Sequence, residues 1–488
     1  MIVPDTPENV KKCICPRCPS MPADCPDETL YCARGKSCCE IHARACICTA
    51  CPVYKENKLE TLYFCDKEAV GSIVHLIRKK GENEDLTAYQ TMVSIRELAE
   101  TGMSRIISMG SQNCLSFSFK DLKFLPAQVS RIPLEREDSV NMSVILGPSA
   151  AKPLKLASPI MISGMSYGAT SKNVRLIISK VTADLNIAYS SGEGGILEEE
   201  YQNAPHHLIG QYATDRGDIQ LDLLRILAAV EIRFGQGAYP GKGSYIPSSK
   251  ITGEVAKTRG LKGLEQSHSP AHFDDILNMS QLKAKVDWLR EATGGIPIGA
   301  KLGCGRMESD IEALVEGGVD FIALDGFGAG TGATEQYVRD NVGLPIIAAI
   351  PRALSALKML GAKDRITLVA GGGLRMPSDF AKCLALGADA VYIGTAALIA
   401  IGCEQYRICH TGMCPTGITT HAPLLERQLN FEMGAKRLNN FVNASTGEIA
   451  NIVRLVGKSD VNKLDHEDLV SFNKDLAALT GVNWLNGE

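Results

Sequence analysis

Short apolar runs alternate with stretches of helical spacing along most of the chain. From residue 158 onward the apolar runs are PIMIS, NIAYS, AVEIRF, IPIGAKL, DFIALD, RITLVAG and AVYIG. Their alternation with helical stretches predicts a parallel sheet. About eight strand–helix units over some 250 residues is the size of a (β/α)8 barrel. We therefore expect an α/β fold of the TIM-barrel type.

Different patterns flank the predicted barrel. The segment LTAYQTMVSIRELAETG has apolar positions at helical spacing, and the chain then becomes irregular. The tail after Gln428 has a mainly helical pattern. These patterns predict four parts: a cysteine-rich module at 1–66, a helical and irregular arm at 67–150, the barrel at 151–428, and a helical tail at 429–488.

Composition favours a globular protein with small-molecule or protein partners. Of the 488 residues, 45% are hydrophobic and 22% are charged, which is enough to bury a large core. A net charge of -4 gives no reason to expect nucleic acid or an anionic membrane as partner. The N-terminus lacks a basic-then-apolar signal, and the longest uncharged apolar stretch, 390–402, is too short to span a bilayer. We expect a cytoplasmic protein.

Eleven of the 17 cysteines precede residue 66, and eight of these form a repeat with an offset of 33 residues. Both copies read Cys-Ile-Cys-x-x-Cys-Pro. The first copy contains Cys13, Cys15, Cys18 and Cys32, and the second contains Cys46, Cys48, Cys51 and Cys65. Without an export signal, this density indicates metal or cluster ligation rather than disulfides.

Each copy of the repeat offers four thiolates, the number that a 4Fe-4S cluster or a structural zinc requires. We expect two 4Fe-4S clusters, with zinc in a docking module as the alternative. As in two-cluster ferredoxins, the fourth cysteine of each copy is a candidate ligand of the other cluster. Cys38 and Cys39 remain alternative ligands, and Cys25 is left over.

Glycine-rich segments follow five of the predicted strands. They are SGMSYGATS (163–171), SGEGG (191–195), DGFGAGTGA (325–333), GGGL (371–374) and IGTA (393–396). In a barrel of this type the active site lies at the carboxyl ends of the strands, and the loops after the last two commonly bind phosphate. The five segments therefore predict a cofactor site at that end, with Glu193 at its mouth.

Lys301 ends the predicted strand IPIGAKL. At that position its ammonium could stabilise negative charge on the pyrimidine side of a reduced flavin. The alternative is a solvated lysine without a chemical role.

Three cysteines follow the last strand–helix unit: Cys403, Cys409 and Cys414. Three thiolates on one compact loop indicate a 3Fe-4S cluster close to the flavin. Zinc is the alternative, with His410 as an added ligand.

From about residue 119 to residue 428 the chain resembles the FMN-binding synthase domain of glutamate synthase. The matching strings include SGMSYGATS, SSGEGG, QGAYPGKGSYIPSSKI, SPAHFDDI, DGFGAGTGA and IGCEQYRICHTGMCPTGITT, and the last is the most specific. The N-terminal repeat resembles a small cysteine-rich domain of anaerobic archaea. The resemblance implies that Cys403, Cys409 and Cys414 hold 3Fe-4S and that FMN contacts Gly164, Met165, Ser166, Ser191, Gln236, Lys301, Asp325, Gly330, Thr331, Gly372, Gly373, Gly394 and Thr395.

The sequence departs from this family around the 2-oxoglutarate site. Tyr239, Pro240, Gly241 and Lys242 stand where the family usually has Lys-Pro-Gly-Glu, and Arg233 stands where it has lysine. Neither a glutaminase domain nor the usual ferredoxin-like insert is recognised. We therefore expect ammonia to come from solution or from a separate amidotransferase subunit, and the N-terminal repeat to replace the insert.

The resemblance implies an FMN- and iron–sulfur-dependent enzyme that reduces 2-iminoglutarate, formed from 2-oxoglutarate and ammonia, to glutamate. Its catalytic candidates are Glu193 for substrate positioning or proton handling, Arg233 and Gln236 for binding carboxylates, and Lys301 at the flavin. Electrons would enter from a redox protein partner, ferredoxin-like or a larger oxidoreductase, and we expect a homo-oligomer. The alternatives are a methylated-amine or other amino-acid dehydrogenase and an electron-carrying subunit of a larger complex.

Overall fold

The computed structural model describes residues 3–21, 28–42, 44–59, 62–66, 84–111, 113, 115–215 and 221–485. The chain forms two compact units, Met1–Arg105 and Ile106–Glu488. Within the described parts, none of the helices is both long and apolar enough to cross a membrane.

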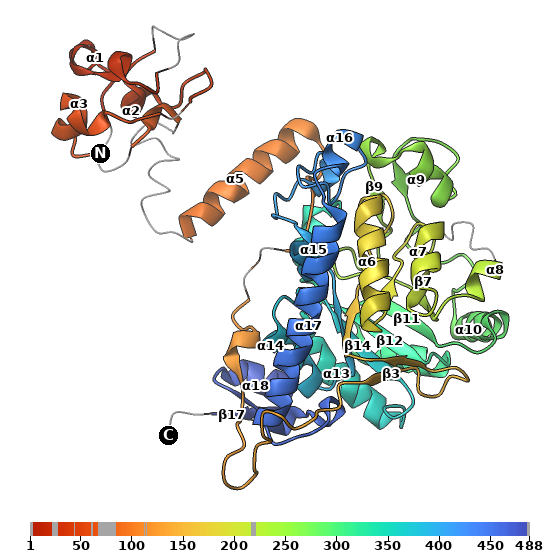
Figure 1. The fold of residues 1–488 in the computed structure, drawn as a ribbon. Helices are drawn as coiled ribbons and strands as arrows, with labels where there is room; N and C mark the ends of the chain where they lie inside the picture. Colours follow the sequence, from red (N-terminus) through yellow and green to blue (C-terminus); the bar gives the residue numbers. More distant parts are fainter. Residues whose placement is uncertain are drawn as a thin grey trace. The chain divides into compact units, whose positions relative to one another are not determined.

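The second unit is built on a closed barrel of eight parallel strands, which confirms the predicted α/β TIM-barrel fold (Figure 1). Every barrel residue except Gly303 is buried, because one face packs inside the barrel and the other under the helices. In chain order the strands are β5 (Ile160–Ile162), β6 (Tyr189–Ser190), β7 (Leu208–Tyr212), β8 (Ala229–Arg233), β11 (Ile298–Gly303), β12 (Phe321–Asp325), β14 (Thr367–Gly371) and β15 (Ala390–Ile393).

Helices between the strands cover the outside of the barrel. The longer ones are α6 (Lys172–Leu185), α10 (Met279–Thr293), α11 (Met307–Glu316), α13 (Ile346–Met359), α14 (Pro377–Ala385) and α15 (Thr395–Ile401). Shorter helices lie in the segments that connect or follow these elements: α7 (Glu198–Asn203), α8 (Leu221–Leu224), α9 (Gly253–Thr258), α12 (Gln336–Asn341) and α16 (Pro423–Glu426).

The C-terminal tail begins with the long helix α17 (Phe431–Leu455), which packs along α6, α14 and α15 (Figure 1). The tail then adds α18 (Lys474–Thr480) and two strands, β16 (Leu469–Ser471) and β17 (Asn483–Trp484). These strands join β2 (Leu122–Phe124) in a three-stranded sheet. The tail thereby anchors the segment that precedes the barrel.

Three small antiparallel pairs complete the second unit. They are β3 (Val144–Leu146) with β4 (Leu154–Leu156), β9 (Tyr245–Ile246) with β10 (Ser267–His268), and β1 (Ile106–Ile107) with β13 (Thr334–Glu335). The last pair matters for the site, because it ties the segment before the barrel to the loop after β12.

In its described residues the first unit contains three short helices around a small core and, after them in the chain, one helix of 18 residues, α5 (Glu84–Thr101). The short helices are α1 (Pro7–Lys12), α2 (Tyr31–Arg34) and α3 (Pro52–Glu56). The repeat is visible in two equivalent 3-10 turns, η1 (Cys15–Arg17) and η2 (Cys48–Ala50). The buried core side chains are Val3, Leu30, Tyr31, Cys32, Cys51, Val53 and Phe64.

Candidate active site and cysteine clusters

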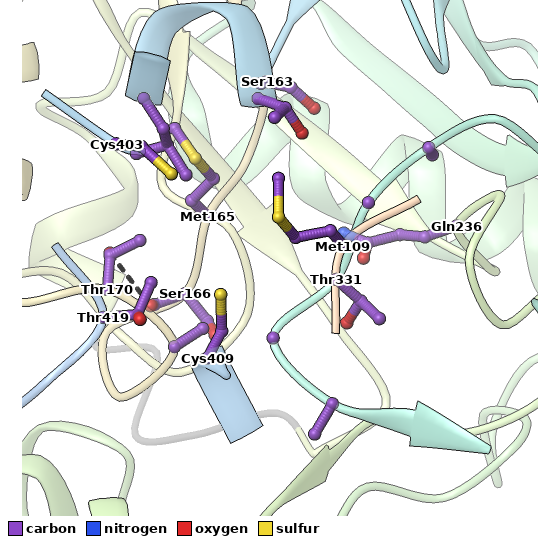
Figure 2. Close-up of a pocket in the computed structure, with 18 of the residues that line it drawn as sticks. Met109, Ser163, Met165, Ser166, Thr170, Gln236, Thr331, Cys403, Cys409 and Thr419 are labelled. Carbon is purple, nitrogen blue, oxygen red and sulfur yellow. Dashed lines mark hydrogen bonds between the residues drawn. The ribbon is translucent and has the colours of Figure 1, made fainter. Parts of the chain in front are cut away.

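One large cavity opens at the carboxyl ends of the barrel strands (Figure 2). The five glycine-rich segments and the cysteine loop converge on it, as the positions of the strand ends predict. Of the residues that the sequence singled out, the cavity is lined by Gly164, Met165, Ser166, Glu193, Gln236, Lys301, Asp325, Gly330, Thr331, Gly372, Gly373, Gly394, Thr395, Cys403, Cys409 and Cys414.

Two predicted residues do not line this cavity. Ser191 is turned into the protein, where its Oγ donates to the carbonyl of Gly192 (2.9 Å) and accepts from the amide of Gln211 (3.0 Å). Arg233 lies at the end of β8, and its guanidinium is paired with Glu193. The cavity residues were identifiable because they follow strands, whereas side-chain direction within a turn leaves no such mark in the sequence.

Lys301 is buried at the base of the cavity, with only 1% of its side chain exposed. Its Nζ atom donates to Ser163 Oγ (3.0 Å), lies 3.8 Å from Asp325 Oδ2, and lies 5.2 Å from the ring centroid of Tyr392. The alternative of a solvated lysine is therefore wrong. A fixed cation at this depth can stabilise negative charge on a bound molecule, because little water competes for it.

Glu193 lies between two buried arginines at the cavity wall. It pairs with Arg233, accepts from Arg259 Nη2 (2.9 Å), and accepts from the hydroxyl of Ser244. Burial disfavours its charge, but the two guanidiniums outweigh burial and lower its pKa. The two buried cations beside Glu193 therefore favour the charged form of its carboxyl group.

Asp215 lies beside this group and behaves in the opposite way. Burial, followed by the negative charge of Glu193, raises its pKa to about 7. Its carboxyl contacts Arg259 Nη2 at 3.4 Å. No sequence pattern singles out Asp215, since the charge that acts on it belongs to a residue 22 positions away in the chain.

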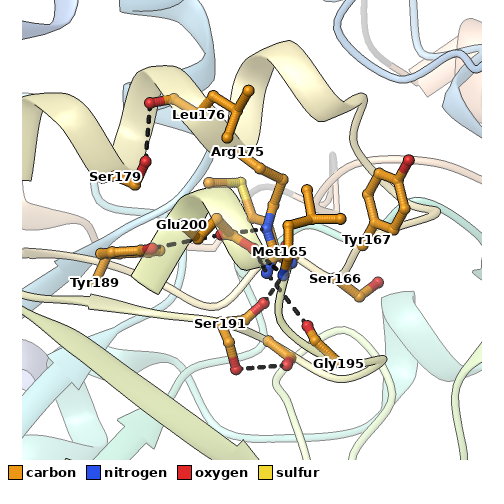
Figure 3. Close-up of polar contacts among 12 residues, drawn as sticks. Met165, Ser166, Tyr167, Arg175, Leu176, Ser179, Tyr189, Ser191, Gly195 and Glu200 are labelled. Atoms are coloured by element: carbon orange, nitrogen blue, oxygen red, sulfur yellow. Dashed lines mark hydrogen bonds and ion pairs between the residues drawn. The ribbon is translucent and has the colours of Figure 1, made fainter. Parts of the chain in front are cut away.

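Arg175 on α6 joins the two turns that form one side of the cavity (Figure 3). Its guanidinium makes a two-point ion pair with Glu200, with Nε···Oε1 at 2.7 Å and Nη2···Oε2 at 2.6 Å. The same guanidinium donates to the carbonyls of Met165 (3.0 Å) and Ser191 (2.7 Å). Both charged side chains are almost fully buried, so this pair fixes the position of the SGMSYGATS and SGEGG turns.

The cysteine loop contributes three thiols to the same cavity. Lys250 is buried against it: its Nζ donates to the carbonyl of Ala169 (2.7 Å). Burial lowers the pKa of Lys250 to about 8, and the charges of Cys409 and Cys414 act in the opposite direction. A cation at this position offsets part of the negative charge that three thiolates bring together.

The segment before the barrel also reaches the site. Met109 lines the cavity, and its amide donates to the carbonyl of Thr331 at 2.8 Å (Figure 2). The Oγ of Ser108 lies 2.7 Å from His410 Nδ1, so this ring nitrogen is already engaged by a hydroxyl. Sequence patterns did not single out these contacts, which come from segments more than 200 residues apart.

Main chain packs closely against main chain around the cavity. At Gly372, where φ is +105°, an added Cβ would lie 2.5 Å from the amide nitrogen of Gly326. At Gly330 it would lie 3.3 Å from the amide nitrogen of Gly110. Only glycine fits at Gly372, and the loops after β12, β14 and β15 together form a cradle that suits a flat ring and its phosphate.

The first unit has a cavity of its own, lined by all eight cysteines of the repeat: Cys13, Cys15, Cys18, Cys32, Cys46, Cys48, Cys51 and Cys65. Among the described residues, no three His, Cys, Asp or Glu side chains converge on a single metal-ion position. Eight thiols around one cavity match the number of ligands that two 4Fe-4S clusters, or two zinc ions, require.

Comparison with known proteins agrees with this geometry. Residues 92–459 match the family model described as the conserved region in glutamate synthase. Residues 13–66, which contain the cysteine repeat, match a family of unknown function, DUF2769.

Several curated proteins are similar over most of the chain. A glutamate synthase large subunit-like protein of Rhizobium meliloti is 37% identical over 82% of this chain and 95% of its own length. An archaeal-type glutamate synthase (NADPH) of a Thermotoga species is 34% identical over 84% of this chain and 86% of its own. An archaeal glutamate synthase (NADPH) of Methanocaldococcus jannaschii is 38% identical over 68% of this chain and 64% of its own. The chain therefore belongs to the glutamate synthase family, and it is an oxidoreductase of the glutamate synthase type.

Proposed function

We propose that this chain reduces 2-iminoglutarate to glutamate with bound FMN, using electrons that arrive through iron–sulfur clusters. The main observation that supports this proposal is that a buried lysine, a glycine cradle and three cysteines share one cavity at the carboxyl end of the barrel. In such a barrel this end holds the active site.

FMN supplies hydride transfer when it is bound. The residues that would hold it are those of the glycine cradle, with Gly372, Gly373, Gly394 and Thr395 at its phosphate. The Lys301 ammonium would stabilise negative charge at the ring. Ser163 and Asp325 keep this ammonium in place, since both contact its Nζ atom.

The reaction condenses 2-oxoglutarate with ammonia, releases water, and forms a carbon–nitrogen double bond. A hydride then adds to the carbon and a proton to the nitrogen, which yields glutamate. Gln236 and Tyr239 line the cavity and hydrogen-bond to each other, so they are the polar groups offered to this substrate. The role proposed for Arg233 changes from binding substrate to holding Glu193, because its guanidinium is engaged there.

Iron–sulfur clusters would carry the electrons, one at a time. Cys403, Cys409 and Cys414 would hold a 3Fe-4S cluster beside the flavin site, since they line the same cavity. The cysteines of the N-terminal repeat would hold two 4Fe-4S clusters that receive electrons from a redox protein partner. Such a partner is needed in this proposal because the clusters carry electrons but do not generate them.

A single-turnover experiment tests the proposal. The purified chain is reduced without oxygen and mixed with 2-oxoglutarate and ammonium while flavin absorbance and glutamate are followed. We expect the flavin to reoxidise and at least one glutamate to form per flavin, because the reduced clusters can supply further electrons, and neither to happen when ammonium is omitted. The proposal is overturned if the flavin stays reduced both with 2-oxoglutarate and ammonium and with other oxo acids and ammonium.

The same assay, run with oxidised flavin, examines the amine-dehydrogenase alternative. Methylated amines and other amino acids are then offered as electron donors. Bleaching of the flavin by one of these, together with no turnover of 2-oxoglutarate, would favour the alternative.

A further inference from the structure

The eight cysteines of the N-terminal repeat line a single, largely apolar cavity. Cys38 and Cys39 are not part of its lining, and Cys39 is disulfide-bonded. The two alternative ligands that the sequence offered therefore lie outside the cavity. How the eight thiols divide between two clusters can be inferred from their surroundings.

The two copies of the repeat hold their first cysteine in the same way. The amide of Leu30 donates to Cys13 Sγ, and the amide of Tyr63 donates to Cys46 Sγ, both at 3.3 Å. Leu30 and Tyr63 have left-handed backbone conformations, with φ of +56° and +57°. Because this conformation is costly for side chains of their size, its recurrence at equivalent positions indicates that both amides are aimed at sulfur.

The third cysteine of the first copy reaches across to the second copy. Cys18 Sγ donates to the carbonyl of Ala45 at 3.4 Å, and Ala45 directly precedes Cys46. Ser20 reinforces the contact, because its Oγ donates to the same carbonyl (2.7 Å) and accepts from the amide of Arg44 (2.9 Å). The segment after Cys18 is thus attached to the start of the other copy.

The equivalence of the two copies extends this contact into a reciprocal exchange. Cys18 of the first copy belongs with Cys46 of the second, and the counterpart set is Cys51 with Cys13; all four line the same cavity. A shift of 33 residues converts one set into the other. This reciprocity is what a pseudo-twofold arrangement of the copies requires.

We propose that the N-terminal unit binds two 4Fe-4S clusters and that the two copies exchange their third cysteines. One cluster takes Cys13, Cys15, Cys32 and Cys51, and the other takes Cys46, Cys48, Cys65 and Cys18. The sequence suggested an exchange of the fourth cysteines, but the contacts of Cys18 indicate the third. The proposal rests on the iron–sulfur part of the proposed function, and it means that neither copy can assemble its cluster alone.

Paired substitutions in the full chain, purified without oxygen, test this division. Cys18→Ala with Cys46→Ala removes two ligands of one proposed cluster, so about four of the eight irons of the module should be lost. Cys18→Ala with Cys13→Ala removes one ligand from each cluster, and alanine cannot replace a thiolate, so about eight irons should be lost. Division without exchange, or with exchange of the fourth cysteines, predicts the reverse order and would overturn the proposal. Cys38→Ser, outside the cavity, is the control and should keep its full iron content.

A second measurement covers the case in which damage to one cluster empties the whole module. Each single variant is examined by EPR, since serine can replace one thiolate and leave an altered cluster signal. Cys18→Ser and Cys65→Ser should alter the same signal, and Cys13→Ser should alter the other. A shared signal for Cys18→Ser and Cys13→Ser, or zinc in place of iron in the unmodified module, contradicts the proposal.

The iron assays and the glutamate assay fail independently. With a small-molecule reductant, the barrel can be assayed in variants that lack the module clusters. An iron content that differs from the predicted one, together with normal glutamate formation, would refute only the exchange of cysteines. The predicted iron content without glutamate formation would refute only the proposed reaction.

Discussion

Arg233 at the end of β8 and Glu193 after β6 form an ion pair in which only 2% and 3% of their side chains are exposed. Arg259, also 2% exposed, contacts the second oxygen of the same carboxylate. The family resemblance had made Arg233 a candidate for binding substrate carboxylate. In the structure its guanidinium instead binds the carboxylate of Glu193.

Removal of the Arg233 charge should destabilise the protein strongly. Arg233→Met leaves a buried Glu193 with one cation fewer, and loss of one partner of a buried pair costs about 3–5 kcal/mol. Arg233→Lys restores the charge and should recover most of this loss. Denaturant unfolding of the flavin-loaded protein measures both, and equal stability of the two variants would show that the charge is not what matters.

Arg175 should determine how well the cavity holds FMN. Arg175→Ala removes the donor that joins the carbonyls of Met165 and Ser191, so both turns lose their fixed position. We expect FMN affinity, measured by quenching of flavin fluorescence, to fall by at least about tenfold, which corresponds to 1.4 kcal/mol. Lys180→Ala on the same helix, where Lys180 is exposed and pairs with Asp184, is the control. Unchanged affinity in Arg175→Ala would refute this role.

Lys301 should affect the flavin more than the fold. Lys301→Met removes a buried cation at the cavity base, so the midpoint potential of bound FMN should fall because its reduced, negatively charged form loses stabilisation. Loss of a single stabilising group of this kind commonly lowers turnover by about 100- to 1000-fold. Lys358→Met, at an exposed position of α13, should leave both quantities unchanged. A potential in Lys301→Met that equals that of the unaltered protein would argue against this role.

Asp215 should make stability depend on pH. Its pKa of about 7 in the folded chain exceeds the ordinary value of 3.8, so the folded state holds a proton that the unfolded state has lost. Stability should therefore fall as pH rises through this window and level off above it. Asp215→Asn lacks this ionisation, so its melting temperature, relative to that of the unaltered protein, should increase from about pH 5 to pH 8. A constant difference over that range would contradict the assigned pKa.

Hydrophobic pattern identified the barrel but missed one strand. The seven predicted runs contain the other barrel strands, whereas β7 reads LIGQY and its polar Gln211 interrupts the apolar pattern. Gln211 is buried because its amide donates to Glu231 Oε1 at 2.8 Å inside the barrel. Because the partner of Gln211 is distant in the chain, the pattern of β7 alone does not indicate that this polar residue is buried.

The site was predictable to the extent that its residues follow strands. Glycine segments, Lys301 and the cysteine loop were found because strand ends fix their location. Met109, Arg175 and Lys250 were not found, since each acts through contacts with segments distant in the chain. The direction in which Arg233 and Ser191 point was likewise decided by tertiary partners.

The most direct test of the whole account is the content of iron, labile sulfide, zinc and flavin in the chain purified without oxygen. The account predicts about eleven irons, one FMN and a 3Fe-4S EPR signal in the oxidised protein. Zinc with only three irons would contradict the electron path and reduce the N-terminal unit to a structural module. Absence of FMN would contradict the account at its centre.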